Sequence, residues 1–291
     1  MCALIKLALD RDPENADAIA NLQDMQASDP SLVAGTAQPA SRDAAVATGA
    51  GTLNSWVTDA LDAAHRIIGL SGMRVLEVGG SVPPEAVRRL GVAKWVACDL
   101  ATTPCDEDDY QALHADARAL PQEAESFDAA YSVCAFEHFD GIDAVLSEIH
   151  RTLRPGGRLF TQFAPIWSSS IGHHVWIIEN GRNVVTFNDN VIPHWGHLLL
   201  EEHELRNYLT VVRSAPLAEQ ICNYISVNSY INRVFEAEFR WQFQSSRFVV
   251  ELIEPWGGHT SPGAQMLAAL RQRWPEGGDF AAHGLRVVLK K

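Results

Sequence analysis

The chain has 291 residues and a formal net charge of −13, with 47% apolar and 20% charged residues. This composition is that of an ordinary globular protein, and the length allows one large domain with attachments. So acidic a surface, with no run of more than two Lys or Arg, repels phosphate backbones. Nucleic acid is therefore excluded as the first candidate partner.

Cysteine usage and hydropathy predict where the protein works. The cysteines are scattered and form no C-x-x-C pair, which favours a reducing cytoplasm over a disulfide framework. They are Cys2, Cys98, Cys105, Cys134 and Cys222. The amino-terminal stretch is soon broken by acids, unlike a signal peptide, and no window approaches 18 uninterrupted apolar residues. We therefore expect no membrane span.

The first 50 residues differ in composition from the rest. Residues 1–28 read as helical around a D-P-E-N turn at 12–15, which resembles one junction between tetratricopeptide repeats. A single junction cannot build a solenoid, so we interpret it as a remnant or a helix pair that docks a protein partner. Residues 29–50 are rich in Ala, Ser, Thr, Gly and Pro, which is typical of a linker. The main domain is then predicted over 51–291.

Beyond residue 51, short apolar runs alternate with helical patterns. Alternation of this kind predicts an α/β fold with a mostly parallel, doubly wound sheet, here of seven strands. The predicted strands are 73–79, 94–100, 127–136, 157–165, 248–256 and 284–291, and the helices are 52–70, 84–91, 140–153, 233–246 and 261–274. In such sheets ligands bind beyond the carboxyl ends of the strands.

Glycines and acids follow these predicted strands. Gly79 and Gly80 let a backbone approach a ligand closely, and Asp99 lies 20 residues past Gly79, the spacing of an acid that grips ribose hydroxyls. Pro83 or Pro84 stands where a dinucleotide loop carries its third glycine, and either can begin the next helix. The missing glycine argues against a nicotinamide dehydrogenase.

Five motifs in order strongly resemble the class I S-adenosylmethionine-dependent methyltransferases. They are VLEVGG, ACDL, HADA, FDAAYSVCAFEHF and LRPGGRLF, within residues 73–164. The resemblance implies a Rossmann-like fold and S-adenosylmethionine as cofactor, which lacks the pyrophosphate that makes a third glycine obligatory. It places Glu77 and Gly79 at the amino-acid end of the cofactor, Asp99 at its ribose and Asp116 at the adenine amino group. The residues implied to line the cofactor site are Glu77, Gly79, Gly80, Ser81, Asp99, Leu100, Asp116, Ala117, Ser132, Cys134 and Ala135.

An insert over about 166–232 follows the fifth motif and is rich in His and Trp. It leaves the carboxyl edge of the predicted sheet, where lids and specificity loops belong. Its proposed substrate contacts are Trp167, Trp176, His194, Trp195 and His197, and it also holds His173, His174 and His203. A metal site built from these imidazoles is the alternative, but adjacent histidines rarely converge on one ion, so we expect no metal. Simple packing of a lid is a further alternative.

The expected reaction is methyl transfer to a hydroxyl of a polar small molecule or glycan. A neutral imidazole can take the hydroxyl proton, and we assign that role to His173 or His174, with His138 as a further candidate. The G-H-H and P-H-W-G-H-L-L phrases are similar to a methyltransferase subgroup found with surface-glycan enzymes. Two alternatives stay open: a decarboxylase or cyclase that uses the same cofactor, and a non-catalytic scaffold. The retained acids Glu77, Asp99 and Asp116 argue against the scaffold.

Overall fold

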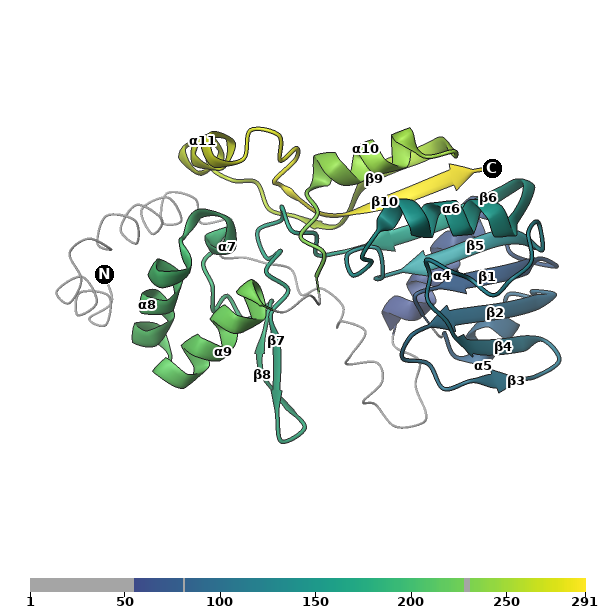
Figure 1. Ribbon diagram of the computed structural model, residues 1–291, viewed down its shortest axis with the longest axis horizontal. Coiled ribbons are helices and arrows are strands. Elements are labelled where there is room, and N and C mark those ends of the chain that lie inside the picture. Colours follow the sequence, from purple (N-terminus) through teal and green to yellow (C-terminus); the bar gives the residue numbers. More distant parts are fainter. Residues whose placement is uncertain (1–54, 81, 228–230) are drawn as a thin grey trace. The chain divides into compact units, whose positions relative to one another are not determined.

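The computed structural model describes residues 55–80, 82–227 and 231–291 (Figure 1). These residues form two compact units, each with its own core. The first, here called the sheet unit, comprises the described residues of 55–164, 239–256 and 284–291. The second, the insert unit, comprises those of 165–238 and 257–283. The predicted helical extension (1–28) and linker (29–50) lie outside the described residues.

The sheet of the described chain has the strand order β3-β4-β2-β1-β5-β6-β10-β9 (Figure 1). Its parallel part comprises β4 (Tyr110–His114), β2 (Lys94–Asp99), β1 (Arg74–Val78), β5 (Phe127–Val133) and β6 (Leu153–Phe163). β10 (Ala282–Lys290) runs antiparallel to β6, and β9 (Val249–His259) lies beside β10. The mostly parallel α/β sheet is confirmed. It has eight strands rather than seven, because β3 (Cys105–Asp106) pairs antiparallel with the edge of β4.

The strand order reverses between β1 and β5. From β1 the chain continues to β2 and β4 on one side, then returns to β5 on the other side of β1. In parallel sheets this reversal opens a crevice at the carboxyl ends of the two central strands. The side chain of Ser132, near the end of β5, joins the two strands there by donating to the carbonyl of Val78 (2.8 Å). The motifs at these strand ends are therefore placed at the switch point.

Helices bury apolar stripes against the sheet. α4 (Ser55–Ile68) packs Leu61 and Ala64 into a core that includes Trp95 and Tyr131, whose ring centroids are 5.4 Å apart. α6 (Ile142–Thr152) buries one face, and α10 (Glu236–Ser245) brings aromatic rings to the aromatic side chains of β6. α5 (Pro84–Arg88) begins at Pro84 with Pro83 as the preceding cap residue. The prediction that a proline begins this helix is confirmed.

The insert unit has regular structure that the sequence did not predict in detail. It contains the hairpin β7 (Trp176–Glu179) and β8 (Arg182–Thr186), and the helices α7 (Gly196–Leu199), α8 (Glu202–Val212), α9 (Ala215–Ser226) and α11 (Ala264–Arg273). Its core combines the first of its two chain segments with α11, through residues such as Trp195, Ile221 and Met266. Within residues 55–80, 82–227 and 231–291, no helix combines the length and apolarity that a membrane crossing needs.

Candidate active site

The turn after β1 is held in a conformation that only a glycine fits. Gly79 has φ of +76°, and its N–H donates to the carbonyl of Cys98 at 2.9 Å. A Cβ at this position would lie 2.6 Å from the Cβ of Ala135 and 2.8 Å from Cζ of Phe139. The backbone of Gly79 therefore packs directly against Ala135 and Phe139, which leave no room for a side chain.

The side chain of Glu77 stabilises this turn through hydrogen bonds. Its carboxylate is 3% exposed, and both oxygens accept from the backbone N–H of Val82, at 3.1 and 3.0 Å. One of them also accepts from Nε1 of Trp95 at 2.7 Å, and the hydroxyl of Tyr110 donates to the carbonyl of Val82. These bonds fix the turn without the third glycine of a dinucleotide loop. Contact of Glu77 with the cofactor stays a prediction, and Ser81 lies outside the described residues.

Asp99 ends β2 at the next strand along the edge. Its side chain is partly exposed, and Oδ1 accepts from the backbone N–H of Ala101 at 2.7 Å. Leu100, directly after it, is 62% exposed. An acid that can accept from hydroxyls thus stands beside an uncovered apolar side chain, a pair that suits a ribose and the ring system attached to it.

Asp116 follows β4, and its carboxylate binds Arg118, a residue that the sequence motifs did not indicate. Oδ1 accepts from the backbone N–H and Nε of Arg118 (2.8 and 3.1 Å), and Oδ2 accepts from Nη2 and Nε (2.8 and 3.2 Å). The Arg118 side chain, through these hydrogen bonds, holds the pKa of Asp116 below its usual range. The sequence signal for this ion pair is the D-A-R motif, in which Arg118 lies two residues after Asp116. Ala117, between the two, is partly buried.

The end of β5 contributes backbone and small side chains. Cys134 adopts φ of +50°, unusual for a residue with a side chain, and its N–H donates to the carbonyl of Gln162 at 2.9 Å. Ala135 packs directly against Gly79. Glu137 is buried, and its Oε1 lies 3.9 Å from Nε2 of His138. This tight segment therefore places His138 directly after the strand end in the sheet unit.

These residues fit the cofactor that the motifs imply. Gly79 supplies a turn without a side chain after β1, which suits close approach of a ligand to the backbone. Gly79, Asp99, Asp116 and Ser132 follow or end four strands that are neighbours in the parallel sheet. Carboxylates for hydroxyl and amino groups, an exposed apolar side chain and a glycine turn together match an adenosine bearing an amino-acid tail.

The histidines of the insert unit form a buried group. His173, His174, His194 and His197 are each less than a tenth exposed, as are Trp167 and Trp195, whereas Trp176 is half-buried and donates to Asn183. The rings of His173 and His197 have centroids 5.6 Å apart. His194 bonds Asn190 through Nε2 at 3.2 Å. The substrate contacts predicted for this group stay predictions.

Two of these imidazoles have tautomers fixed by hydrogen bonds. Nδ1 of His173 accepts from the backbone N–H of Val175 (3.2 Å), so its proton lies on Nε2. Nε2 of His197 donates to the carbonyl of Trp167 (2.8 Å), which leaves its lone pair on Nδ1. Among the described residues, no group of three or more His, Cys, Asp or Glu is arranged to hold a metal ion.

Burial of these histidines predicts a loss of stability in mild acid. Desolvation lowers the pKa of His197 to about 4, and that of His283, which contacts Ser170 and Thr260, also to about 4. Desolvation first, and then the neighbouring imidazoles, lowers the pKa of His173 in the same direction. In the unfolded chain each titrates near 6.5, so between pH 6.5 and 4 the unfolded state binds more protons. The shifts of His197 and His283 each correspond to roughly 3 kcal/mol lost over that window.

We therefore expect the free energy of unfolding to be highest above pH 7 and to fall steeply between pH 6.5 and 5. Urea titrations followed by tryptophan fluorescence at these pH values measure the slope. The substitutions His197→Gln and His283→Gln remove two titrating groups and should flatten it, even where they lower stability at pH 7.5. An unchanged slope in both variants contradicts the assignment.

Part of the chain is similar in sequence to known methyltransferases. A family model described as a methyltransferase domain matches residues 76–161. A curated relative, the probable phthiotriol/phenolphthiotriol dimycocerosates methyltransferase 2 of Mycobacterium ulcerans (strain Agy99), is 37% identical over 98 residues. That match covers 30% of this chain and 38% of the relative, so the chain spans well under half of the relative's length.

Solved structures of methyltransferases are also similar. An S-adenosylmethionine-dependent methyltransferase from Mesorhizobium loti has a TM-score of 0.47 at 16% identity, over 80% of this chain and 98% of that one. A geranyl diphosphate methyltransferase, solved with GPP and sinefungin, has a TM-score of 0.44 at 14% identity, over 81% of this chain and 77% of that one. The matched segment 76–161 contains the motif residues of β1, β2, β4 and β5 and most of β6. Residues 76–161 therefore carry the sequence of a methyltransferase domain.

Proposed function

We propose that the protein transfers the methyl group of S-adenosylmethionine to a hydroxyl oxygen of a polar small molecule or glycan, in the cytoplasm. The observation that carries the proposal is the tight turn at Gly79, which excludes any Cβ, together with partly exposed acids at the ends of β2 and β4. The curated relative is named for phthiotriol and phenolphthiotriol dimycocerosates, and a triol offers hydroxyl oxygens. That name favours oxygen as the methylated atom here.

Each residue at the strand ends would bind a different part of the cofactor. The backbone of Gly79 and Gly80 would lie against its amino-acid end, Asp99 would accept from the ribose hydroxyls, and Leu100 would cover one side of the ring. Asp116 would accept from the adenine amino group. Because Arg118 already engages both oxygens of Asp116, adenine must share or displace the Arg118 contacts.

Bound S-adenosylmethionine supplies a methyl group on a sulfonium, which is already an excellent leaving group. The chain therefore contributes mainly positioning and exclusion of water, and it must also accept one proton from the hydroxyl. We assign the role of accepting that proton to His173, His174 or His138. His173 must give up its bond from Val175 to accept a proton on Nδ1, whereas His138 lies in the sheet unit directly after β5.

A labelled-methyl assay tests the reaction. The protein is incubated with S-adenosylmethionine carrying a deuterated methyl group and a panel of hydroxylated small molecules and saccharides. Mass spectrometry of the products then detects a labelled methyl in place of one hydrogen. Release of carbon dioxide from the cofactor without a methylated product would indicate a decarboxylase. Failure to bind S-adenosylhomocysteine in calorimetry would indicate a scaffold.

Asp99 provides a test of cofactor binding that needs no acceptor. Replacing Asp99 by Ala removes charge-assisted hydrogen bonds to hydroxyls, each worth about 1.5–3 kcal/mol. We expect the Kd for S-adenosylhomocysteine, measured by calorimetry, to rise by at least about tenfold. Asp59→Ala, at an exposed position of α4, is the control and should leave the Kd unchanged. Equal affinities of wild type and Asp99→Ala contradict the assignment.

A further inference from the structure

The connection between β4 and β5 runs from Ala115 to Ser126 and has no helix or strand of its own. Its first turn is closed by Asp116, whose carbonyl accepts from the N–H of Ala119 at 3.0 Å. Its far end is tied by backbone bonds from Glu125 to the carbonyl of Arg151 and from Ser126 to that of Thr152. The middle of the connection depends on side chains from α6 for its remaining hydrogen bonds.

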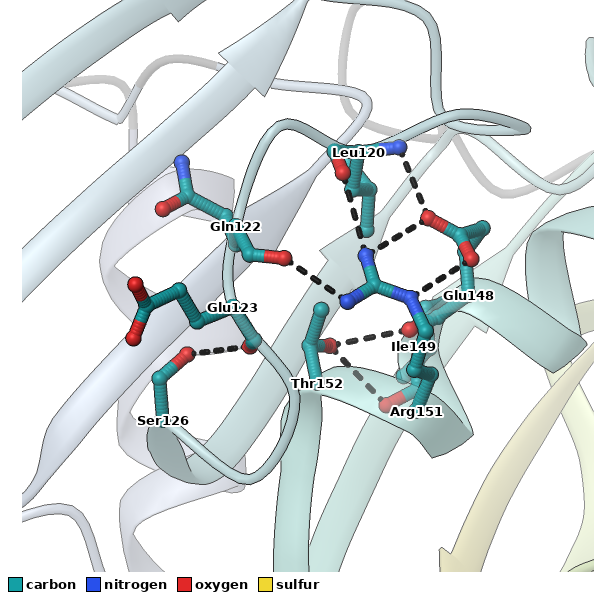
Figure 2. Close-up of polar contacts among 8 residues, drawn as sticks. All are labelled: Leu120, Gln122, Glu123, Ser126, Glu148, Ile149, Arg151 and Thr152. Carbon is teal, nitrogen blue, oxygen red and sulfur yellow. Dashed lines mark hydrogen bonds and ion pairs between the residues drawn. The ribbon is translucent and has the colours of Figure 1, made fainter.

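Glu148 and Arg151 of α6 supply these bonds (Figure 2). Arg151 donates through Nη2 to the carbonyl of Leu120 at 3.0 Å and through Nη1 to the carbonyl of Gln122 at 2.8 Å. Oε2 of Glu148 accepts from the backbone N–H of Leu120 at 2.9 Å. Leu120, held on both its N–H and its carbonyl, is 5% exposed and lies four residues beyond Asp116.

The two side chains also hold each other. Nε and Nη2 of Arg151 donate to Oε1 and Oε2 of Glu148, both at 2.8 Å. Four of the five N–H groups of the guanidinium are thus used, in the planar fork that only arginine offers. Arg151, through its hydrogen bonds, lowers the pKa of Glu148, so the pair stays ionised across the working pH range. We call this arrangement the α6 latch.

We propose that Glu148 and Arg151 are positioning residues, which set the place of Asp116 and so the preference of the site for adenine. This inference rests on the proposed function, because Asp116 is assigned there to the adenine amino group. Neither side chain needs to touch the cofactor. Without the α6 latch, Leu120 and Gln122 are no longer bound to α6. The carboxylate of Asp116, four residues before Leu120, is then no longer held at a fixed distance from the sheet edge.

The experiment compares two ligands whose purine rings differ at position 6 and, as a result, in the proton on N1. S-adenosylhomocysteine carries a 6-amino group, which donates to a carboxylate, whereas S-inosylhomocysteine carries a 6-oxo group, which cannot. Calorimetry on the full chain gives the ratio of their two Kd values. We expect wild type to prefer the amino ligand, and Arg151→Met to lower the preference about tenfold. Arg151→Lys keeps the charge without the planar fork, so it should fall between them.

Hydrogen exchange provides a readout that does not depend on the ligand. The N–H of Leu120 is protected by the Glu148 carboxylate, so Arg151→Met and Glu148→Ala should speed its exchange about tenfold. The matched control is Arg158→Met. Arg158 makes a forked pair with Glu251 at similar exposure in the same unit, but donates to no carbonyl of the connection.

The outcomes separate the inference from the proposed function. A tenfold loss of preference in Arg151→Met, with Arg158→Met like wild type, supports the inference. An unchanged ratio in Arg151→Met and Arg151→Lys overturns it while leaving the methyltransferase intact. If wild type binds neither ligand, the proposed function fails and the positioning role fails with it. If Arg151→Met does not fold, the ratio of the two Kd values measured for Arg151→Lys decides instead.

Discussion

Gly79→Ala is expected to weaken binding of S-adenosylhomocysteine by at least about a hundredfold and to lower the free energy of unfolding by about 2–5 kcal/mol. Two physical costs add. The backbone at φ of +76° is left-handed, which costs a residue with a Cβ on the order of 1–2 kcal/mol. The new methyl also meets Ala135 at 2.6 Å, and relieving that overlap costs about 1–3 kcal/mol. The turn must shift where the cofactor would lie.

Gly72 provides a matched control for this prediction. Its φ of +72° is nearly that of Gly79, it lies in the turn before β1, and nothing stands within 4 Å of its missing Cβ. Gly72→Ala therefore carries the backbone cost alone, and should lower stability by about 1–2 kcal/mol without changing the Kd. Chemical unfolding and calorimetry on both variants separate the two effects. Equal losses of affinity in both variants would mean that strain, and not the close approach, explains the result.

Substitution of the two adjacent histidines is expected to have the largest effect on turnover. A general base contributes about 10²–10⁴-fold to a proton transfer, so removing it should lower kcat by at least about 100-fold. Since neither residue is assigned to the cofactor, the Kd for S-adenosylhomocysteine should stay unchanged. His173→Ala tests the first residue. For His174, which has φ of +52°, Asn is the better replacement because it tolerates the left-handed region.

The control and the alternatives are set by other histidines of the chain. His203, exposed on α8, can be replaced by Ala without loss of a buried contact, and turnover should not change. If neither His173→Ala nor His174→Asn lowers turnover with the best acceptor of the panel, the base is not in this pair. A loss in His138→Gln under the same conditions would then assign the proton to the sheet unit. Thermal melting of each variant identifies losses due to unfolding.

The parts of the fold that the sequence predicted are those with local signals. Apolar runs such as 73–79 and 94–100 end in Gly or Asp, and both are strands of the sheet. The proline that replaces the third glycine is the first residue of α5, as expected. In each case the signal and the structure involve residues close in sequence, where propensity and turn chemistry decide.

The features that the sequence did not reveal depend on contacts between distant residues. Nothing near Glu77 indicates that its carboxylate is bound by Trp95, 18 residues later. The α6 latch joins side chains of a helix to carbonyls some 30 residues earlier, and backbone carbonyls leave no mark on a sequence. Helix α11 of the insert unit matches the helix predicted over 261–274. Helices α8 and α9 were not predicted, because their apolar periodicity is weaker than that of α4 or α6.

The two-segment construction of the insert unit restricts how this protein can be engineered or can have evolved. Its core joins Trp195 and Ile221 to Met266 and Phe280, which enter the chain on opposite sides of β9. Deleting 165–238 alone would remove the residues that pack against α11 and expose its apolar face. A chimera that exchanges the insert unit with that of another methyltransferase must therefore transplant both segments together, with four junctions in place of two.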